Sequence, residues 1–142
     1  MSAMKNIRLA LVSNKETQSI TWTRAELDRI GNAEELQIAS LRGDGTQRNF
    51  VTIWVVRVGD ELYIRSVNGR TSAWFRGVET RHEGHIQAGG VQKDVNFVEE
   101  TNPDINEQID AAYRTKYNYY PPGVDHINSA AARAATLKLV PR

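Results

Sequence analysis

The strongest pattern of hydrophobic positions in the chain lies between residues 50 and 67. The run NFVTIWVVRV places apolar side chains on both faces of an extended strand over 50–58. Gly59-Asp60 then marks a tight turn, and residues 62–67 form the return strand. Because both faces of the first strand are largely apolar, the pattern predicts a central strand in a sandwich or barrel.

The flanking segments predict helices and further strands. Thr23 and Glu26 form a capping-box pattern that opens a short helix, which Gly31 ends. A longer helix opens at the sequence Asn-Pro-Asp, and in it Asp110 is expected to pair with Arg114 one turn later. The remaining expected elements are strands over 36–41, 83–88, 91–98 and 135–141 and helices over 71–78 and 126–133.

These elements sum to an antiparallel β core with a few helices, a mainly β protein of the α+β class. No internal repeat, linker or low-complexity segment divides the chain, and 142 residues are the size of one domain. We therefore expect an N-terminal extension over 1–20 and a single domain over 21–142.

The composition narrows the classes of partner. The chain has 18 Lys and Arg against 17 Asp and Glu, and this balance gives no reason to expect a nucleic acid or an anionic membrane. No segment approaches the ~20 apolar residues that cross a bilayer. The absence of Cys excludes disulfides and thiolate chemistry and favours a reducing compartment, so we expect a cytoplasmic protein.

Known catalytic motifs are absent from the sequence. The stretch HEGH at 82–85 spaces its histidines at i and i+3, whereas a helical zinc motif needs i and i+4, so no metal site is expected. Ser66, Ser72 and Ser129 lack the G-x-S-x-G context of a nucleophile. GDGTQR and GGVQKD match no phosphate-binding loop. The sequence therefore leaves the catalytic residues unknown.

Arginines concentrate in the middle of the chain, which has no lysine between positions 16 and 92. Arg42, Arg48 and Arg70 lie in or beside turns, where a guanidinium and the backbone can both approach a phosphate or carboxylate. For any one of them, a solvated strand edge or a surface ion pair is the commoner role. These three are the best candidates for binding an anion.

Aromatic side chains offer surfaces for stacking. Trp74 lies in the short helix after an Asn-Gly turn, and Thr71 or Ser72 is expected to cap that helix. The indole ring can either pack beneath a barrel or face a cleft and stack on a planar ligand. Tyr119 and Tyr120 can likewise line a pocket mouth or pack at a helix end.

Several separated motifs resemble one bacterial family. They are WTRAELDRI, LRGDGTQRNFVTIWVVRVGDELYIRSVNGRTSAWFRG, GHIQAGGV, IDAAYRTKY and ATLKLVPR, in this order. Together they are similar to domain-of-unknown-function family 2255 over most of the chain. That resemblance implies no established activity.

A more distant likeness links the chain to the antiparallel split β-barrels of the pyridoxamine-phosphate-oxidase-like superfamily, which bind flavin mononucleotide (FMN) or a deazaflavin. Ser66, Gly69 and Trp74 resemble the strand, glycine turn and short helix of deazaflavin-dependent nitroreductases. The Arg-Ser-Gly phosphate signature of those enzymes is not preserved, since this region reads Gly45-Thr46-Gln47-Arg48. The resemblance implies a split β-barrel and a homodimer with the ligand in the cleft between subunits.

Two functional hypotheses stay open. In the first, the protein is a non-catalytic module that binds a small anionic, planar ligand or another protein. In the second, it is a flavin- or deazaflavin-dependent oxidoreductase whose arginines hold the cofactor phosphate. The residues expected to bind the cofactor are Arg42, Arg48, Ser66, Gly69, Arg70 and Trp74. Nucleic-acid binding is the weaker reading, because acidic residues interleave with the arginines.

Overall fold

The computed structural model describes residues 21–142. The helices are α2 (Arg24–Gly31), α3 (Ala73–Arg81), α4 (Pro103–Lys116), α5 (Pro121–Ile127) and α6 (Ala130–Arg133), with a 3₁₀ turn η1 at Gly69–Thr71. The strands are β1 (Leu36–Ser40), β2 (Val51–Ile53), β3 (Val56–Val58), β4 (Glu61–Arg65), β5 (Glu83–Ala88), β6 (Val91–Glu99) and β7 (Thr136–Pro141). The expected extension over 1–20 lies outside the described residues, so the domain boundary stays a prediction.

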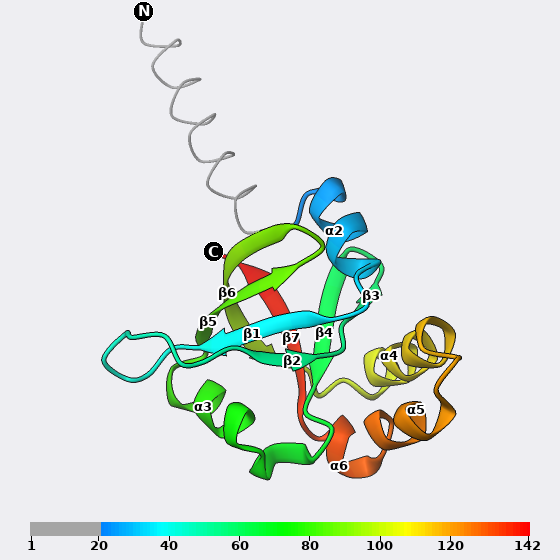
Figure 1. Cartoon of the computed structure of the whole chain (residues 1–142). Helices are drawn as coiled ribbons and strands as arrows, with labels where there is room; N and C mark the ends of the chain where they lie inside the picture. Colours follow the sequence, from blue (N-terminus) through cyan, green and yellow to red (C-terminus); the bar gives the residue numbers. More distant parts are fainter. Residues whose placement is uncertain (1–20) are drawn as a thin grey trace, which may run out of the picture.

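The strands form one seven-stranded antiparallel sheet in the order β2-β1-β5-β6-β7-β4-β3. Figure 1 shows the sheet curling on itself, with α2 at the top, α3 below, and α4, α5 and α6 gathered on one side. The predicted hairpins β3–β4 and β5–β6 both form, and the predicted last strand, β7, pairs between β6 and β4. The predicted antiparallel, mainly β architecture is confirmed.

The strand predicted over 50–58 is not continuous and is not central. It breaks at Trp54-Val55 into β2 and β3, which lie at opposite ends of the strand order. Three residue steps can span only about 11 Å from the end of β2 to the start of β3. The two outer strands must therefore lie close together, and this forces the sheet to close into a barrel that is split between them.

Side chains from the end of α4 bind the backbone at this break. The Tyr117 hydroxyl accepts from the Val55 N–H at 3.3 Å and lies 2.8 Å from the Glu34 carbonyl oxygen, to which it donates. Lys116 Nζ donates to the Val55 carbonyl at 2.6 Å. Buried peptide groups need hydrogen-bond partners. At this break Val55 is not paired with a neighbouring strand, and the two side chains bond its N–H and its carbonyl instead.

Two apolar clusters fill the molecule, one inside the curled sheet and one between the sheet and the helices α4 and α5. Successive side chains of a strand point to opposite faces, so Leu62 and Ile64 of β4 enter the first cluster and Tyr63 enters the second. The strand β4 is thus buried on both faces. Arg65, two residues after Tyr63, consequently points toward the helices.

Arg65 carries a fully buried charge that is hydrogen-bonded on all sides. Its side chain is 0% exposed and donates to the Asp110 carboxylate at 2.5 Å. The other acceptors are the Thr136 hydroxyl at 2.9 Å, the Asn128 side-chain oxygen at 2.9 Å, the Asn106 side-chain oxygen at 2.9 Å and carbonyl at 3.2 Å, and the Ile127 carbonyl at 3.4 Å. A buried cation is tolerated when it is paired and bonded in this way. The network joins β4 to β7, α4 and α5.

The predicted pair between Asp110 and Arg114 does not form. Asp110 faces inward on α4 and bridges Arg65 and Arg133, with the second contact at 3.4 Å. Arg114 is exposed. Helical spacing predicted that these side chains were neighbours, but it did not show that Asp110 belongs to the buried face.

Two helix predictions need correction at their boundaries. The helix predicted over 71–78 begins later, as α3, and Ser72 at its N-cap position makes no capping hydrogen bond, because its hydroxyl lies 2.6 Å from that of Ser66. The helix predicted over 126–133 is in fact the end of α5 followed by α6, which the Ser129 hydroxyl caps.

Within residues 21–142, no helix is long and apolar enough to cross a membrane. The expected cytoplasmic location stays a prediction.

Asp110→Asn should lower the free energy of unfolding by about 3 kcal/mol, because it leaves the buried Arg65 guanidinium without a counter-charge. Urea denaturation followed by circular dichroism measures this loss. Asp125→Asn is the control, since Asp125 is exposed on α5 and has no ion pair within residues 21–142. The control should change the free energy by less than about 0.5 kcal/mol. Equal losses in both variants would show that Asp110 does not compensate Arg65.

Candidate functional site

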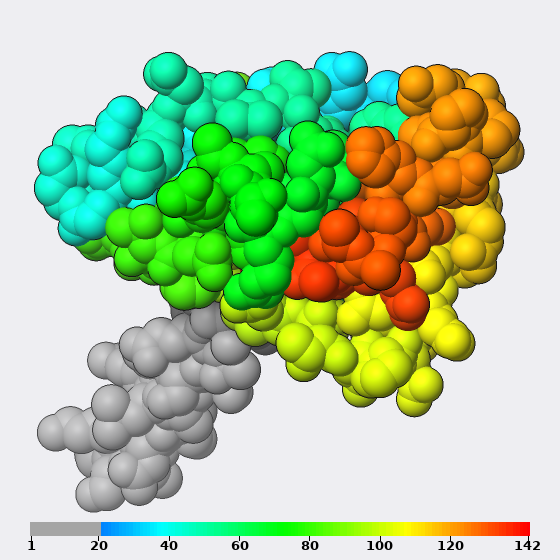
Figure 2. Space-filling view, turned by 90° about the horizontal axis from the view of Figure 1, so that it is seen from below, coloured from blue at the N-terminus to red at the C-terminus, as the bar shows by residue number. Residues whose placement is uncertain are grey.

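Trp74 on α3 stands between two adjoining cavities. The larger has a volume of about 590 Å³ and reaches from β2 to α5, and the smaller has about 260 Å³ and reaches the loop between β1 and β2. Trp74 and Val51 line both, and we call the pair of cavities the Trp74 cleft. Figure 2 shows α3 in the middle of the face seen from below, with the segment near residues 41–50 on one side and α5 and α6 on the other.

The two orientations considered for Trp74 turn out to be compatible. Trp74 is half-buried and packs against the main apolar cluster. Its ring meets that of Phe75 edge to face, with the ring centroids 6.0 Å apart. The same ring lines both cavities. Trp74 therefore anchors α3 to the barrel and also presents surface to the cleft.

Two arginines, Arg42 and Arg48, line the smaller cavity. Arg42 Nη1 donates to the Gln47 carbonyl at 3.0 Å, which holds the guanidinium over its own loop. Within residues 21–142 neither guanidinium has a carboxylate within 4.0 Å. The Asp44 carboxylate is still near enough to Arg42 for the two charges to interact. Neither arginine is held in an ion pair, and a guanidinium beside a cavity suits an anion.

Arg48 also carries a buried donor with no partner. Its Nε has no hydrogen bond, whereas its backbone N–H donates to the Ser40 carbonyl at 2.9 Å. Buried donors are nearly always satisfied, so this Nε is an exception, and a ligand could reach it only if the Arg48 side chain moved. Gly77 on α3 allows Arg48 to lie here, because a Cβ at that position would come within 3.0 Å of Nε and 2.8 Å of Ser40 Oγ.

The larger cavity combines hydroxyl groups with an aromatic wall. The hydroxyl oxygens of Ser66 and Ser72 lie 2.6 Å apart at one side. Trp54 and Tyr120 also line the cavity, and Trp54 stacks on Tyr117 with ring centroids 3.9 Å apart and planes within 7°. Because this stack fixes the indole ring, the wall is preformed. A planar ligand with hydrogen-bonding groups on its edge suits such a cavity.

Two of the six predicted residues lie outside the Trp74 cleft. Gly69 is buried against Ala131 with φ +82, a conformation that favours glycine, in the 3₁₀ turn before α3. Arg70 donates to Glu99 at 2.5 Å and to Glu79 at 3.0 Å, and its hydrogen bond lowers the pKa of Glu99. The structure thus brings together Arg42, Arg48, Ser66 and Trp74 and places Arg70 in an ion-pair network.

Sequence reasoning missed Trp54 and Arg65 as residues of this region. The sequence pattern predicted Trp54 within a continuous strand. In the structure it lies at the break between β2 and β3 and lines the larger cavity. Arg65 lines the larger cavity from within its network, and the available signal was its position in a strand after the apolar residues Leu62, Tyr63 and Ile64. Of the two tyrosines proposed for a pocket mouth, Tyr120 lines the larger cavity, whereas Tyr119 bonds Glu34 through its hydroxyl.

The two histidines of HEGH do not converge. His82 ends α3 with φ 59, whereas His85 lies on β5 with Nδ1 2.9 Å from the Asp94 carboxylate. In the part of the chain that the structure describes, no three His, Asp or Glu side chains are grouped so that they could hold a metal ion.

Solved structures with the same fold share little sequence with the chain. A putative pyridoxamine 5'-phosphate oxidase from Listeria innocua matches with a TM-score of 0.57 at 14% identity, covering 82% of this chain and 90% of that one. An F420-H2-dependent reductase matches with a TM-score of 0.55 at 15% identity, and the match covers 75% of this chain and 93% of the reductase. A structure described as a domain-swapped dimer matches with a TM-score of 0.55 at 15% identity, and the match covers 96% of this chain and 98% of that one. The fold is therefore the antiparallel split β-barrel of pyridoxamine-phosphate-oxidase-like proteins, as the sequence resemblance implied.

Comparison with curated protein sequences finds no match. The model of a family described as "Uncharacterized protein conserved in bacteria (DUF2255)" matches residues 26–139. The matched region includes Arg42, Arg48, Ser66 and Trp74. The chain therefore belongs to this bacterial family, DUF2255.

Proposed function

We propose that the protein binds a small anionic ligand with a planar part in the Trp74 cleft. The observation that carries the proposal is the placement of Arg42 and Arg48 on one side of Trp74, neither of them in an ion pair within 4.0 Å in the described chain. The aromatic-walled cavity lies on the other side. A phosphate or carboxylate would accept hydrogen bonds from the guanidiniums of Arg42 and Arg48. The planar part would lie against Trp74 and Trp54.

A flavin or deazaflavin is the ligand class that fits both cavities. The phosphate would bind Arg42 and Arg48, and the hydroxyls of Ser66 and Ser72 could bond the edge of the ring. Such a cofactor supplies hydride transfer when it is bound, and the residues of this chain would bind and orient it. One fold neighbour is named as an F420-H2-dependent reductase, which supports this class. On this reading the protein is an oxidoreductase.

Ligand binding without redox chemistry is the second candidate, and the loop between β1 and β2 favours it. Deazaflavin enzymes carry Arg-Ser-Gly in the corresponding region, whereas this loop is closed on itself. The Asp44 carboxylate accepts from the Thr46 hydroxyl at 2.7 Å and from its N–H at 3.0 Å. The hydroxyl of this loop is already in use, so a phosphate here would depend on the two arginines.

We also propose that the cleft lies in a homodimer interface. Val67 lines the larger cavity and is 37% exposed, and Phe50, between two residues that line the smaller one, is 39% exposed. These two side chains would be covered if the face around the cleft met a second copy of the chain. The domain-swapped dimer among the fold neighbours supports the assembly. Native mass spectrometry of the full chain would measure it.

Arg48→Ala should weaken binding of FMN or F420 about 10- to 100-fold, the range for losing a charged hydrogen bond. Titration followed by tryptophan fluorescence and cofactor absorbance measures the affinity. Arg70→Ala is the matched control, because Arg70 is paired with Glu99 and Glu79 away from the cleft. It should change the affinity by less than about twofold.

The outcomes separate the two candidate functions. Binding of FMN or F420 that depends on Arg48 supports the cofactor site. If the protein binds neither cofactor but binds pyrophosphate in a way that depends on Arg48, the result supports ligand binding without redox chemistry. Unchanged affinity in Arg48→Ala for every bound anion would remove Arg48 from the site.

Gly77→Ala should displace the Arg48 side chain while changing the free energy of unfolding little. The steric conflict with Arg48 and Ser40 opposes a gain in helix propensity of about 1 kcal/mol. The NMR signal of the Arg48 Nε–H in the ligand-free protein measures the displacement. In the control Gly43→Ala the new Cβ would have no atom closer than 3.9 Å, so that signal should stay in place. An unmoved signal in Gly77→Ala would contradict the packing role.

A further inference from the structure

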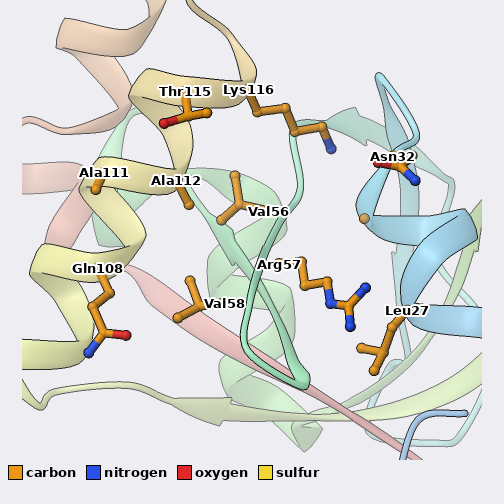
Figure 3. Close-up of a pocket in the computed structure, with 11 residues that line it drawn as sticks. Leu27, Asn32, Val56, Arg57, Val58, Gln108, Ala111, Ala112, Thr115 and Lys116 are labelled. Carbon is orange, nitrogen blue, oxygen red and sulfur yellow. The ribbon is translucent and has the colours of Figure 1, made fainter. Parts of the chain in front are cut away.

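A second hollow lies between α2 and α4, away from the Trp74 cleft. Its volume is about 600 Å³, and no residue that lines it also lines the cleft. Its floor is β3, and Figure 3 shows α4 on one side, the end of α2 on the other, and Val56 and Val58 between them. We call this hollow the α2–α4 groove.

The groove holds an ammonium group that is not in a direct ion pair. Lys116 Nζ donates to the Val55 carbonyl at 2.6 Å and lies 5.1 Å from the centre of the Tyr117 ring. Within residues 21–142 no carboxylate lies within 4.0 Å of it. An ammonium has three N–H donors, and Val55 takes one of them. Figure 3 shows the Lys116 side chain extending across the groove toward Asn32.

Burial has a measurable consequence for this lysine. Desolvation lowers the pKa of Lys116 to about 8, although the nearby charge of Glu34 opposes the change. The group is therefore mostly charged at neutral pH and already partly stripped of water. A charge in this state gains more from an incoming anion than a fully hydrated surface lysine does.

The other charges near the groove are Arg57 and Glu34. Arg57 on β3 is paired with Asp28 of α2 at 2.8 Å and with Asp60 at 3.7 Å. Glu34 lies beyond 4.0 Å from Lys116 and is bonded by the Tyr119 hydroxyl. The positive charge that is not in an ion pair thus lies at the Lys116 end, and Val56, Val58 and Ala112 supply apolar surface beside it.

We propose that the α2–α4 groove binds a small carboxylic acid with an apolar tail. The carboxylate would accept hydrogen bonds from the free N–H groups of Lys116, and Asn32 could add a donor from the opposite wall. The tail would cover Val56, Val58 and Ala112. Charge complementarity selects the carboxylate, and the apolar floor selects the tail.

The proposal predicts a specific pH dependence. A bound carboxylate favours charged Lys116 and so raises its pKa above the free value of about 8. Below that pH the lysine is charged in both the free and the bound state, and the affinity is constant. Above it, binding requires uptake of a proton, and the dissociation constant should rise about tenfold per pH unit until the bound-state pKa is reached.

Hexanoate is a suitable probe, with hexanamide as its neutral counterpart. Titration of the full chain by NMR should show saturable binding of hexanoate, with shifts of the Val56 and Val58 methyl groups, and no saturation with hexanamide. Lys116→Gln should weaken hexanoate binding about tenfold or more, the loss expected for a charged hydrogen bond. Arg114→Gln, an exposed change on the same helix, and Arg48→Ala, in the Trp74 cleft, should leave the affinity measured from the Val56 and Val58 methyl shifts unchanged.

Three results would overturn the proposal: no saturable binding of hexanoate, equal binding of hexanamide, or unchanged affinity in Lys116→Gln. If Lys116→Gln fails to fold because the contact with Val55 is lost, the unmodified chain decides the question. In that case a dissociation constant that stays flat from about two pH units below 8 to about two above it contradicts the role of Lys116. Lys116→Arg keeps the charge and should retain binding.

Discussion

The fold depends on the compensation of one buried charge. None of the Arg65 side chain is exposed, and its burial is tolerated only because acceptors from three other elements surround the guanidinium. These acceptors come from α4, from the segment after α5 and from β7, so they converge only when the helices have packed on the sheet. Apolar contacts are less directional and would tolerate small shifts. We infer that the network selects one position for the helical layer.

The same constraint gives the Trp74 cleft its shape. Ser66 directly follows Arg65, so anchoring the guanidinium holds the Ser66 hydroxyl at the edge of the larger cavity. The opposite wall depends on α4 and α5, because Tyr117 stacks on Trp54 and α5 begins next to Tyr120. The site is thus built from two layers that one buried network joins. A change in that network should disturb both the helical packing and the cleft.

The sequence predicted the features that depend on neighbouring residues, namely the hairpins and the start of the first helix. Alternation and turn residues revealed the hairpins, and the Thr23 capping box opens α2 as expected. The break at Trp54-Val55 was not predictable, because a continuous strand and a strand that crosses between two sheet edges have the same alternating pattern. Arg42 and Arg48 were found through their turns. The partners of Arg70 stand 9 and 29 residues away, and no local pattern reveals such pairs.

The place of β7 affects how the chain can assemble during synthesis. This strand, Thr136–Pro141, lies between β6 and β4, and it is the only ladder in the described chain that joins β2-β1-β5-β6 to β4–β3. Until this strand has emerged, the edges of β6 and β4 that pair with it are unpaired. Such edges are sites of aggregation until they are covered. Closure of the barrel must wait until residue 141 has left the ribosome, and chaperone protection would matter most in that interval.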